Sequence, residues 1–163
     1  MLFLFDVDGT LISSYMDNPD KDFSTWHLLP LRKQVIRNLV KQGHVIGLVT
    51  NQAGVGLGYV TEKQVHEKIA RVLHELRIPD APWEVCYSHR GAKSVRYNNP
   101  KELARRKPSG TMIREILHRY PDAAAQGAVY VGDRPTDKQA ARSAGVHFEY
   151  ADSFFPSRAQ EDS

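Results

Sequence analysis

The sequence of 163 residues has little cysteine and no long apolar run. Its single cysteine, Cys86, excludes an internal disulfide framework and a zinc site made of four cysteines. A lone cysteine fits a reducing compartment, so we expect a cytoplasmic protein. No apolar stretch approaches the length of a membrane span, and Asp6 interrupts the N-terminal run too early for a signal peptide. We therefore expect no contact with a membrane.

The composition is that of an ordinary globular protein. Hydrophobic residues make up 41% and charged residues 25%, and the length suits one domain with a core of its own. We expect the domain to cover residues 1–156 and to be followed by a polar tail, 157–163. The formal charge of +3 favours anionic ligands without requiring nucleic acid.

The most informative stretch is residues 2–11, LFLFDVDGTL. Its apolar start is too short for a helix and lacks polar alternation, which predicts a strand buried on both faces. Asp6 and Asp8 follow where this strand ends, and open parallel sheets bind ligands at the carboxyl ends of their strands. Two carboxylates this close need a cation or a shared proton. We predict a metal and acid–base site; the alternative is an Asp-Gly turn with solvated carboxylates.

Helical and strand-like patterns alternate along the rest of the chain. This alternation predicts an α/β fold, a doubly wound, three-layer, Rossmann-like parallel sheet of strand order 3-2-1-4-5 without a large cap domain. The segments between elements include a polar flap, 9–29, and a basic loop, 89–107. The expected strands are 2–5, 45–49, 83–88, 128–131 and 146–150. The expected helix starts are Pro30, a capping box of Thr61 with Gln64, the residues after Gly110, and a second capping box of Thr136 with Gln139.

Further polar side chains follow the other strands of this sheet. Thr50 and Asn51 end the second strand, Asp133 follows the fourth, and Asp137 lies one helical turn later. Lys107 precedes a helix, where a cation is unfavourable for the helix dipole, and such violations suggest function. Carboxylates without soft ligands suit Mg²⁺, whereas a hydroxyl, an amide and a lysine suit a phosphate. Together they form a complete set for phosphoryl transfer.

Four stretches in this order resemble the motifs of the haloacid dehalogenase (HAD) superfamily of phosphatases. They are Asp6-Val7-Asp8-Gly9-Thr10, Val49-Thr50-Asn51, Arg106-Lys107-Pro108 and Gly132-Asp133 through Asp137. They span nearly the whole chain, and four ordered motifs with one chemistry are far more specific than any one of them. The resemblance implies a HAD-like phosphatase domain over residues 1–156.

The resemblance also implies a role for each of these residues. Asp6 would be the nucleophile and Asp8 the general acid and base. Thr50, Asn51 and Lys107 would hold the transferred phosphoryl group, and Arg106 would contact the substrate. Mg²⁺ would be bound by Asp6, Asp133 and the backbone carbonyl of Asp8, with Asp137 supporting the metal.

Within the superfamily, the chain resembles the small-capped group. This group includes heptose bisphosphate phosphatase, histidinol phosphatase and the 3′-phosphatase domain of polynucleotide kinases. The first two commonly carry a zinc loop of three cysteines and a histidine. Here Cys86 and His89 match its first half, but Ala104 and Arg105 stand before Arg106 where cysteines would be needed. We therefore expect no zinc, and a Cys86 that is simply buried in a strand.

These observations predict a Mg²⁺-dependent phosphomonoester hydrolase that acts through an aspartyl-phosphate. Its substrate would be a sugar (bis)phosphate or another phosphorylated small molecule. One alternative is a nucleic-acid 3′-phosphatase, because cations are dense between Arg90 and Lys107; such a run is, however, usually a solvated face. A second alternative is a phosphotransferase, which passes the phosphoryl group to an acceptor other than water. A third is a non-catalytic module that binds an anion or a partner. Such a module would not need both Asp6 and Asp8.

Overall fold

The computed structural model describes residues 1–156 and contains one sheet of five parallel strands. The strand order is β3-β2-β1-β4-β5, as predicted from the sequence. The strands are β1 (Leu2–Phe5), β2 (Val45–Asn51), β3 (Trp83–Cys86), β4 (Ala128–Gly132) and β5 (His147–Tyr150). The helices are α1 (Arg32–Lys41), α2 (Ala53–Gly56), α3 (Glu62–Glu75), α4 (Pro100–Leu103), α5 (Thr111–Arg119), α6 (Pro121–Ala125), α7 (Pro135–Ala144) and α8 (Ala151–Phe154).

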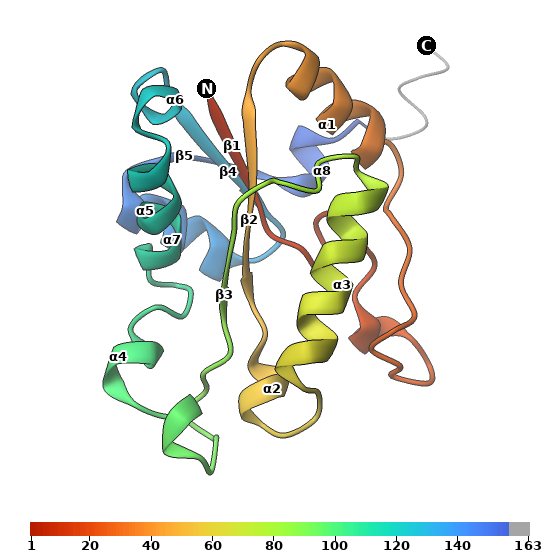
Figure 1. The fold of residues 1–163 in the computed structure, drawn as a ribbon, viewed down its shortest axis with the longest axis vertical. Helices are drawn as coiled ribbons and strands as arrows, with labels where there is room; N and C mark the ends of the chain where they lie inside the picture. Colours follow the sequence, from red (N-terminus) through yellow and green to blue (C-terminus); the bar gives the residue numbers. More distant parts are fainter. Residues whose placement is uncertain (157–163) are drawn as a thin grey trace.

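The sheet is covered by helices on both faces (Figure 1). Helices α1 and α3 lie on one face, and α5 and α7 on the other. Strand β1 lies at the centre, paired with β2 and β4. Because successive side chains of a strand point to opposite faces, Phe3 and Phe5 join one core and Leu2 and Leu4 the other. This explains why the first strand is apolar throughout.

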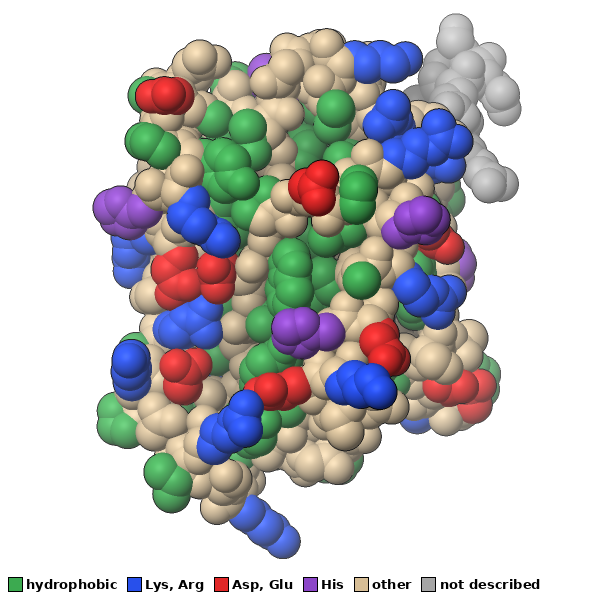
Figure 2. Space-filling view, in the orientation of Figure 1, with side chains coloured by type: hydrophobic (Ala, Val, Ile, Leu, Met, Phe, Trp, Pro, Cys, Tyr) green, Lys and Arg blue, Asp and Glu red, His purple; other side chains and the backbone are tan. Residues whose placement is uncertain are grey.

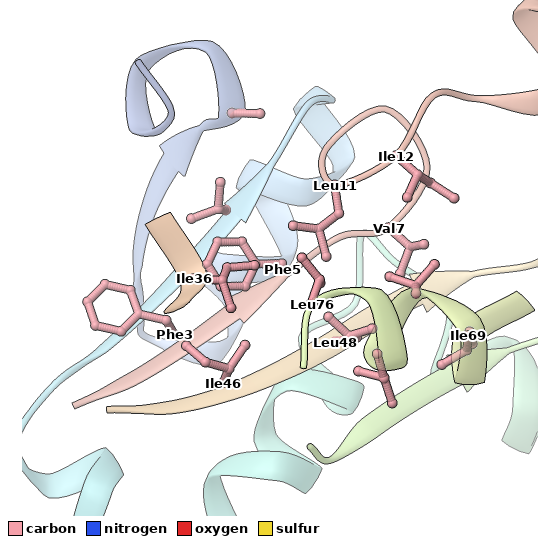
Figure 3. Close-up of a cluster of buried hydrophobic side chains, with 14 of the residues drawn as sticks. Phe3, Phe5, Val7, Leu11, Ile12, Ile36, Ile46, Leu48, Ile69 and Leu76 are labelled. Atoms are coloured by element: carbon pink, nitrogen blue, oxygen red, sulfur yellow. The ribbon is translucent and has the colours of Figure 1, made fainter. Parts of the chain in front are cut away.

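The larger core lies between the sheet and helices α1 and α3. Figure 3 shows Phe5 and Leu48 from the strands meeting Ile36 of α1 and Ile69 of α3. Residues that directly follow the two aspartates, such as Leu11, are buried in the same cluster. The chain beyond the tip of β1 is therefore anchored in the core, which fixes the aspartates relative to the sheet.

Helix α3 begins as the sequence predicts. The side chain of Thr61 accepts from the backbone N–H of Gln64, and the Gln64 side chain accepts from the backbone N–H of Thr61. The end of α7 is also as expected, since Gly145 adopts a left-handed conformation with φ of 74°.

Two predicted helix starts were wrong. Pro30 is not in the first turn of α1, because Leu31 follows it with φ of 67° and the helix begins only at Arg32. Helix α7 does not begin with a capping box of Thr136 and Gln139. It begins earlier, at Pro135, and Asp137 accepts from the backbone N–H of Arg134 instead.

Two excursions leave the carboxyl edge of the sheet. Figure 1 shows the flap (9–29) and the basic loop (89–107) on opposite sides of the lower end of the strands. The helices of each are only short turns, so within residues 1–156 no large cap domain covers this edge. In the flap, Phe23 is buried in the larger core, and Tyr15 and Trp26 pack against it. These aromatic residues anchor the flap.

No helix in residues 1–156 combines the length and apolar character needed to cross a membrane. The predicted polar tail, 157–163, lies outside the described residues.

Candidate active site

Asp6 and Lys107 meet in the interior, just beyond the tip of β1. The Lys107 Nζ donates to Asp6 Oδ1 at 2.9 Å, and Thr10 Oγ1 donates to Asp6 Oδ2 at 3.2 Å. Lys107 is only 5% exposed and Asp6 6%. An ammonium this deeply buried requires charged partners, so its position before α5 is explained by these contacts rather than by the helix.

Asp137 is the second carboxylate that forms an ion pair with Lys107. Its Oδ1 accepts from Lys107 Nζ at 2.6 Å and from the Tyr130 hydroxyl at 3.0 Å. Its Oδ2 accepts from the backbone N–H groups of Asp133 and Arg134 at 3.2 and 3.1 Å. One side chain thus begins α7 and fixes the loop that carries Asp133.

Two glycines make room for these carboxylates. Gly9 has φ of 83°, and a Cβ on it would collide with the carboxylate of Asp133. A Cβ on Gly132 would collide with the side chain of Asp137. The two strand tips can therefore bring their acidic side chains together only because both positions lack a side chain.

The carboxylates of Asp6, Asp133 and Asp137 each place an oxygen within 4.8 Å of the others. Burial raises the pKa of Asp6 well above its usual range, and although Lys107 opposes this, Asp137 and Asp133 add to it. Lys107 pairs with Asp6 and Asp137, and the exposed Asp133 lies close to both, so the three carboxylates carry more negative charge than this one ammonium neutralises. Oxygen ligands with such an excess fit a hard divalent cation. The donor set of the site therefore fits Mg²⁺; Asp133 is its exposed member, whereas Asp6 and Asp137 are buried.

Asp8 lies apart from this group. Its Oδ1 accepts from Lys68 Nζ at 3.0 Å, and its Oδ2 accepts from Gln52 Nε2 at 2.8 Å. The side chain remains 20% exposed, and it faces the same cavity as Asp6. Its carboxylate is thus free of the acidic cluster, while the metal-binding role implied for its backbone carbonyl stays a prediction.

Asn51 holds the loop that carries Lys107. Its Oδ1 accepts from the backbone N–H of Lys107 at 3.0 Å, and its Nδ2 donates to the Lys107 carbonyl at 3.2 Å. Thr50 is 1% exposed, and its hydroxyl accepts from Gln52 Nε2 at 2.9 Å. The tip of β2 therefore joins the loop before α5 to the strand tip that carries Asp8.

A cavity of about 390 Å³ opens over these groups. It is lined by Asp6, Asp8, Thr50 and Lys107, and by Arg106, whose guanidinium donates to the carbonyl of Ser88 at 3.3 Å. All the predicted site residues thus line it except Asp133. Tyr15 of the flap lines the cavity too, and so do residues for which no site role was predicted: Met16, Leu57, Tyr59, Arg134 and Thr136.

Part of the positive charge of the basic loop is neutralised in the folded protein. Arg96 pairs with Glu62 at 3.1 Å, and Arg105 pairs with Glu84 at 2.9 Å and Glu115 at 2.9 Å. In Figure 2, acidic and basic side chains alternate along the side of the molecule where α5, β3 and α4 lie. Glutamates from other elements therefore neutralise part of the charge that the sequence run displays.

Cys86 and His89, the two residues that match half of a zinc loop, have separate partners. Cys86 is fully buried, as expected, and its Sγ donates to the carbonyl of Glu102 at 3.4 Å. Burial raises the pKa of this thiol. His89 Nδ1 accepts from the backbone N–H of Gly91 at 2.9 Å. Neither residue belongs to a metal-sized cluster of acidic, His or Cys side chains within residues 1–156.

Three functional contacts were missed from the sequence. Lys68 carried a usable signal, because a lysine stood on the apolar face of a predicted amphipathic helix. Gln52 directly follows Thr50 and Asn51, and its amide side chain at a strand tip was a weaker signal. Tyr130 carried no signal, since a tyrosine inside a buried strand is typical of core packing.

Comparison with known proteins identifies the family of the chain. A family model described as polynucleotide kinase 3 phosphatase matches residues 1–160. D-glycero-beta-D-manno-heptose-1,7-bisphosphate 7-phosphatase of Bordetella bronchiseptica is 29% identical over 158 residues, 88% of this chain and 76% of that protein. An uncharacterized 20.8 kDa protein of Autographa californica nuclear polyhedrosis virus is 28% identical over 134 residues. That match covers 79% of this chain and 63% of the viral protein, less than two thirds of its length.

A solved structure extends the likeness to the fold. The D,D-heptose 1,7-bisphosphate phosphatase of B. bronchiseptica, in complex with magnesium and phosphate, superposes with a TM-score of 0.68 and 28% identity. The match covers 90% of this chain and 78% of that one. This chain belongs to the polynucleotide kinase 3 phosphatase family of HAD-like phosphatases and is related to the heptose-1,7-bisphosphate phosphatases.

Proposed function

We propose that this chain is a Mg²⁺-dependent phosphomonoester hydrolase that forms an aspartyl-phosphate on Asp6. The observation that carries the proposal is the pair of buried carboxylates, Asp6 and Asp137, that accept from Lys107 beneath an open cavity, with the exposed Asp133 close to both. Such a group holds more negative charge than its lysine neutralises, which suits a divalent cation and a phosphate bound together. The magnesium and phosphate in the related heptose bisphosphate phosphatase support this assignment.

The residues of the chain divide the reaction between them. An oxygen of Asp6 attacks phosphorus, the bond from phosphorus to the leaving oxygen breaks, and Asp8 gives that oxygen its proton. Asp8 then takes a proton from the water that hydrolyses the aspartyl-phosphate. Lys107 and Thr50 hold the phosphoryl oxygens, and Asn51 fixes the Lys107 backbone.

The metal would be held by Asp6, Asp133 and the backbone carbonyl of Asp8, with Asp137 fixing the Asp133 loop. Bound there, Mg²⁺ supplies charge neutralisation for the phosphate oxygens. Asp137 would support the metal site without binding the ion directly, because Lys107, Tyr130 and two backbone N–H groups already engage both of its oxygens.

A sugar (bis)phosphate or another small phosphate ester is the leading substrate class. The relation to heptose bisphosphate phosphatases supports it. The second candidate is a nucleic-acid 3′-phosphate, supported by the family model. The basic loop favours it weakly, because Arg96 and Arg105 are already paired with glutamates.

The test is a panel of phosphate esters with Mg²⁺, which includes sugar mono- and bisphosphates and a 3′-phosphorylated oligonucleotide. We expect sugar phosphates to have the highest kcat/KM. If no ester is hydrolysed with Mg²⁺, the proposed function is wrong.

A salt series separates the two substrate classes. Within residues 1–156, Arg90, Lys93 and Lys101 are cations of the loop that are in no ion pair and do not line the cavity. If the loop tracks a nucleic acid, log Kobs falls by roughly one unit per phosphate contact for each unit of log salt. Joint replacement of the three cations by alanine then weakens the oligonucleotide and spares the sugar phosphate. Equal effects on both substrates would exclude the nucleic-acid role of the loop.

A further inference from the structure

Lys68 is a buried cation on the inward face of α3. It is 4% exposed and lies between Val65, Ile69 and Val72, which are all buried in the larger core. A charged side chain at such a position costs free energy that an apolar residue would not. Its presence therefore points to a contact that an apolar side chain could not make.

The Lys68 ammonium joins three parts of the molecule. Its Nζ lies 3.0 Å from Asp8 Oδ1, just beyond the tip of β1. It also lies 3.9 Å from the centre of the Phe23 ring and 5.1 Å from that of Tyr15, both in the flap. A cation over an aromatic face is attracted to it, and more strongly where water is excluded. Helix α3, the flap and Asp8 are thus held by one side chain.

The two oxygens of Asp8 have different partners. Lys68 engages Oδ1, whereas Oδ2 accepts from Gln52 Nε2 at 2.8 Å. Gln52 and Asp8 both line the cavity. With Oδ1 held by a buried cation and Oδ2 by Gln52, the carboxyl group cannot rotate freely, so these two side chains set how Asp8 faces the cavity.

We propose that Lys68 is a positioning residue that orients Asp8 for proton transfer and links it to the flap. This inference rests on the proposed phosphatase function. As the bond from phosphorus to oxygen breaks, the proton passes from Asp8 to the leaving oxygen, and Asp8 ends as a carboxylate paired with Lys68. The contribution of Lys68 is therefore large only when the leaving group needs that proton.

The test compares two leaving groups in a Lys68→Met variant with Mg²⁺ present. An alkyl phosphate, such as a sugar 6-phosphate, must release an alkoxide and needs the proton, whereas p-nitrophenyl phosphate releases a stable phenolate. The comparison uses kcat/KM, which includes only the steps through formation of the aspartyl-phosphate. We expect a loss of about 10²-fold for the alkyl ester and less than about 5-fold for the nitrophenyl ester.

Matched variants separate positioning from structure. Lys63→Met removes an exposed lysine from the same helix and should leave both rates unchanged. Lys68→Arg keeps the charge and should recover most of the alkyl-to-nitrophenyl rate ratio. Lys68→Gln removes the charge but keeps a polar side chain. We expect it, too, to lower the alkyl-to-nitrophenyl rate ratio. If Lys68→Met does not fold, Lys68→Gln provides the test of the positioning role.

Two outcomes have distinct meanings. Equal losses for both esters in the folded neutral variants would overturn the positioning role of Lys68 while leaving the phosphatase function in place. A wild-type protein that hydrolyses neither ester, nor any other in the panel above, would instead defeat the proposed function.

Discussion

Two groups of three carboxylates surround a cation in this chain, and they differ in burial and in charge balance. At the candidate site, Lys107 pairs with Asp6 and Asp137, and all three are nearly inaccessible, while Asp133 lies close to both carboxylates and is exposed. At the surface, Arg105 pairs with three glutamates whose side chains are 22% to 37% exposed. They are Glu84, Glu102 and Glu115.

The surface group is close to balanced. Arg119 adds a second cation by pairing with Glu84 at 2.8 Å, and Arg105 spreads its guanidinium donors over several acceptors. The hydrogen bond from Arg105 holds the pKa of Glu115 below its usual range. Burial and the neighbouring Glu115 raise the pKa of Glu84, whereas Arg119 and Arg105 oppose this, so cations of the chain itself pair with the carboxylates of this group.

The buried group is not balanced. Desolvation raises the pKa of Asp6 despite the nearby ammonium of Lys107, so the ionised form is disfavoured until another cation arrives. We therefore expect burial together with a charge deficit, rather than the number of carboxylates, to distinguish the metal site from the surface group.

The largest effect is expected for Asp6→Asn. The amide keeps the shape but removes the attacking charge, so kcat should fall by at least ~10³-fold while the protein stays folded. Steady-state kinetics with a sugar phosphate, alongside circular dichroism, measure both. The matched change in the surface group, Glu84→Gln, should leave kcat within about twofold, because Glu84 does not line the cavity. A folded Asp6→Asn protein with near-normal turnover would contradict the mechanism.

Metal removal should act on the buried group alone. EDTA should abolish activity and Mg²⁺ restore it. Mg²⁺ at about 100 times its dissociation constant should also stabilise the folded protein by about 2.7 kcal/mol. Urea unfolding with and without Mg²⁺ measures this, and Glu84→Gln should respond like the wild type. One zinc per purified chain, measured by elemental analysis, would instead show that Cys86 and His89 recruit further ligands.

Lys107→Met and Arg105→Met compare the two central cations directly. Without its ammonium, the buried group keeps unpaired carboxylates, and the free energy of unfolding should fall by about 3 kcal/mol in the absence of metal. The partly exposed Arg105 should contribute only about 1 kcal/mol. Urea unfolding of both variants provides the measurement. Equal losses would mean that burial does not distinguish the two groups.

The sequence predicted most of what lies on strand tips. Strand order, Asp6, Asp8, Asp133 and Asp137 follow from local patterns, because the carboxyl ends of parallel strands meet at one edge. Positions set by local backbone choices were less certain, as Leu31 shows: its left-handed conformation delays the start of α1.

Ion-pair partners that come from distant elements could not be predicted from the sequence. Arg105, Arg106 and Lys107 are consecutive, yet the first joins a surface group, the second lines the cavity and the third enters the acidic group. Charge counted along the chain gave one basic loop, whereas Glu62 and Glu84 neutralise parts of it from α3 and β3. Only the tertiary arrangement decides which cation is left for a ligand.

The smallest effect is expected beside the surface group, at Tyr87. Its hydroxyl is buried and has no hydrogen-bond partner in the described part of the chain, and burial raises its pKa to about 12. It lies with Arg105 and Glu102 around one cavity but joins neither. Tyr87→Phe removes an unsatisfied polar group, so the free energy of unfolding should stay within about 0.5 kcal/mol or rise.

Tyr97→Phe is the matched control for this change. The Tyr97 hydroxyl donates to Glu62 Oε1 at 2.9 Å, and the two tyrosine rings pack edge to face. Losing that hydrogen bond should lower the free energy of unfolding by about 1 kcal/mol, because the carboxylate acceptor is partly buried. Urea denaturation of both variants measures the difference. A loss at Tyr87 equal to that at Tyr97 would show that the Tyr87 hydroxyl is paired in solution, and that the surface group extends further than its ion pairs.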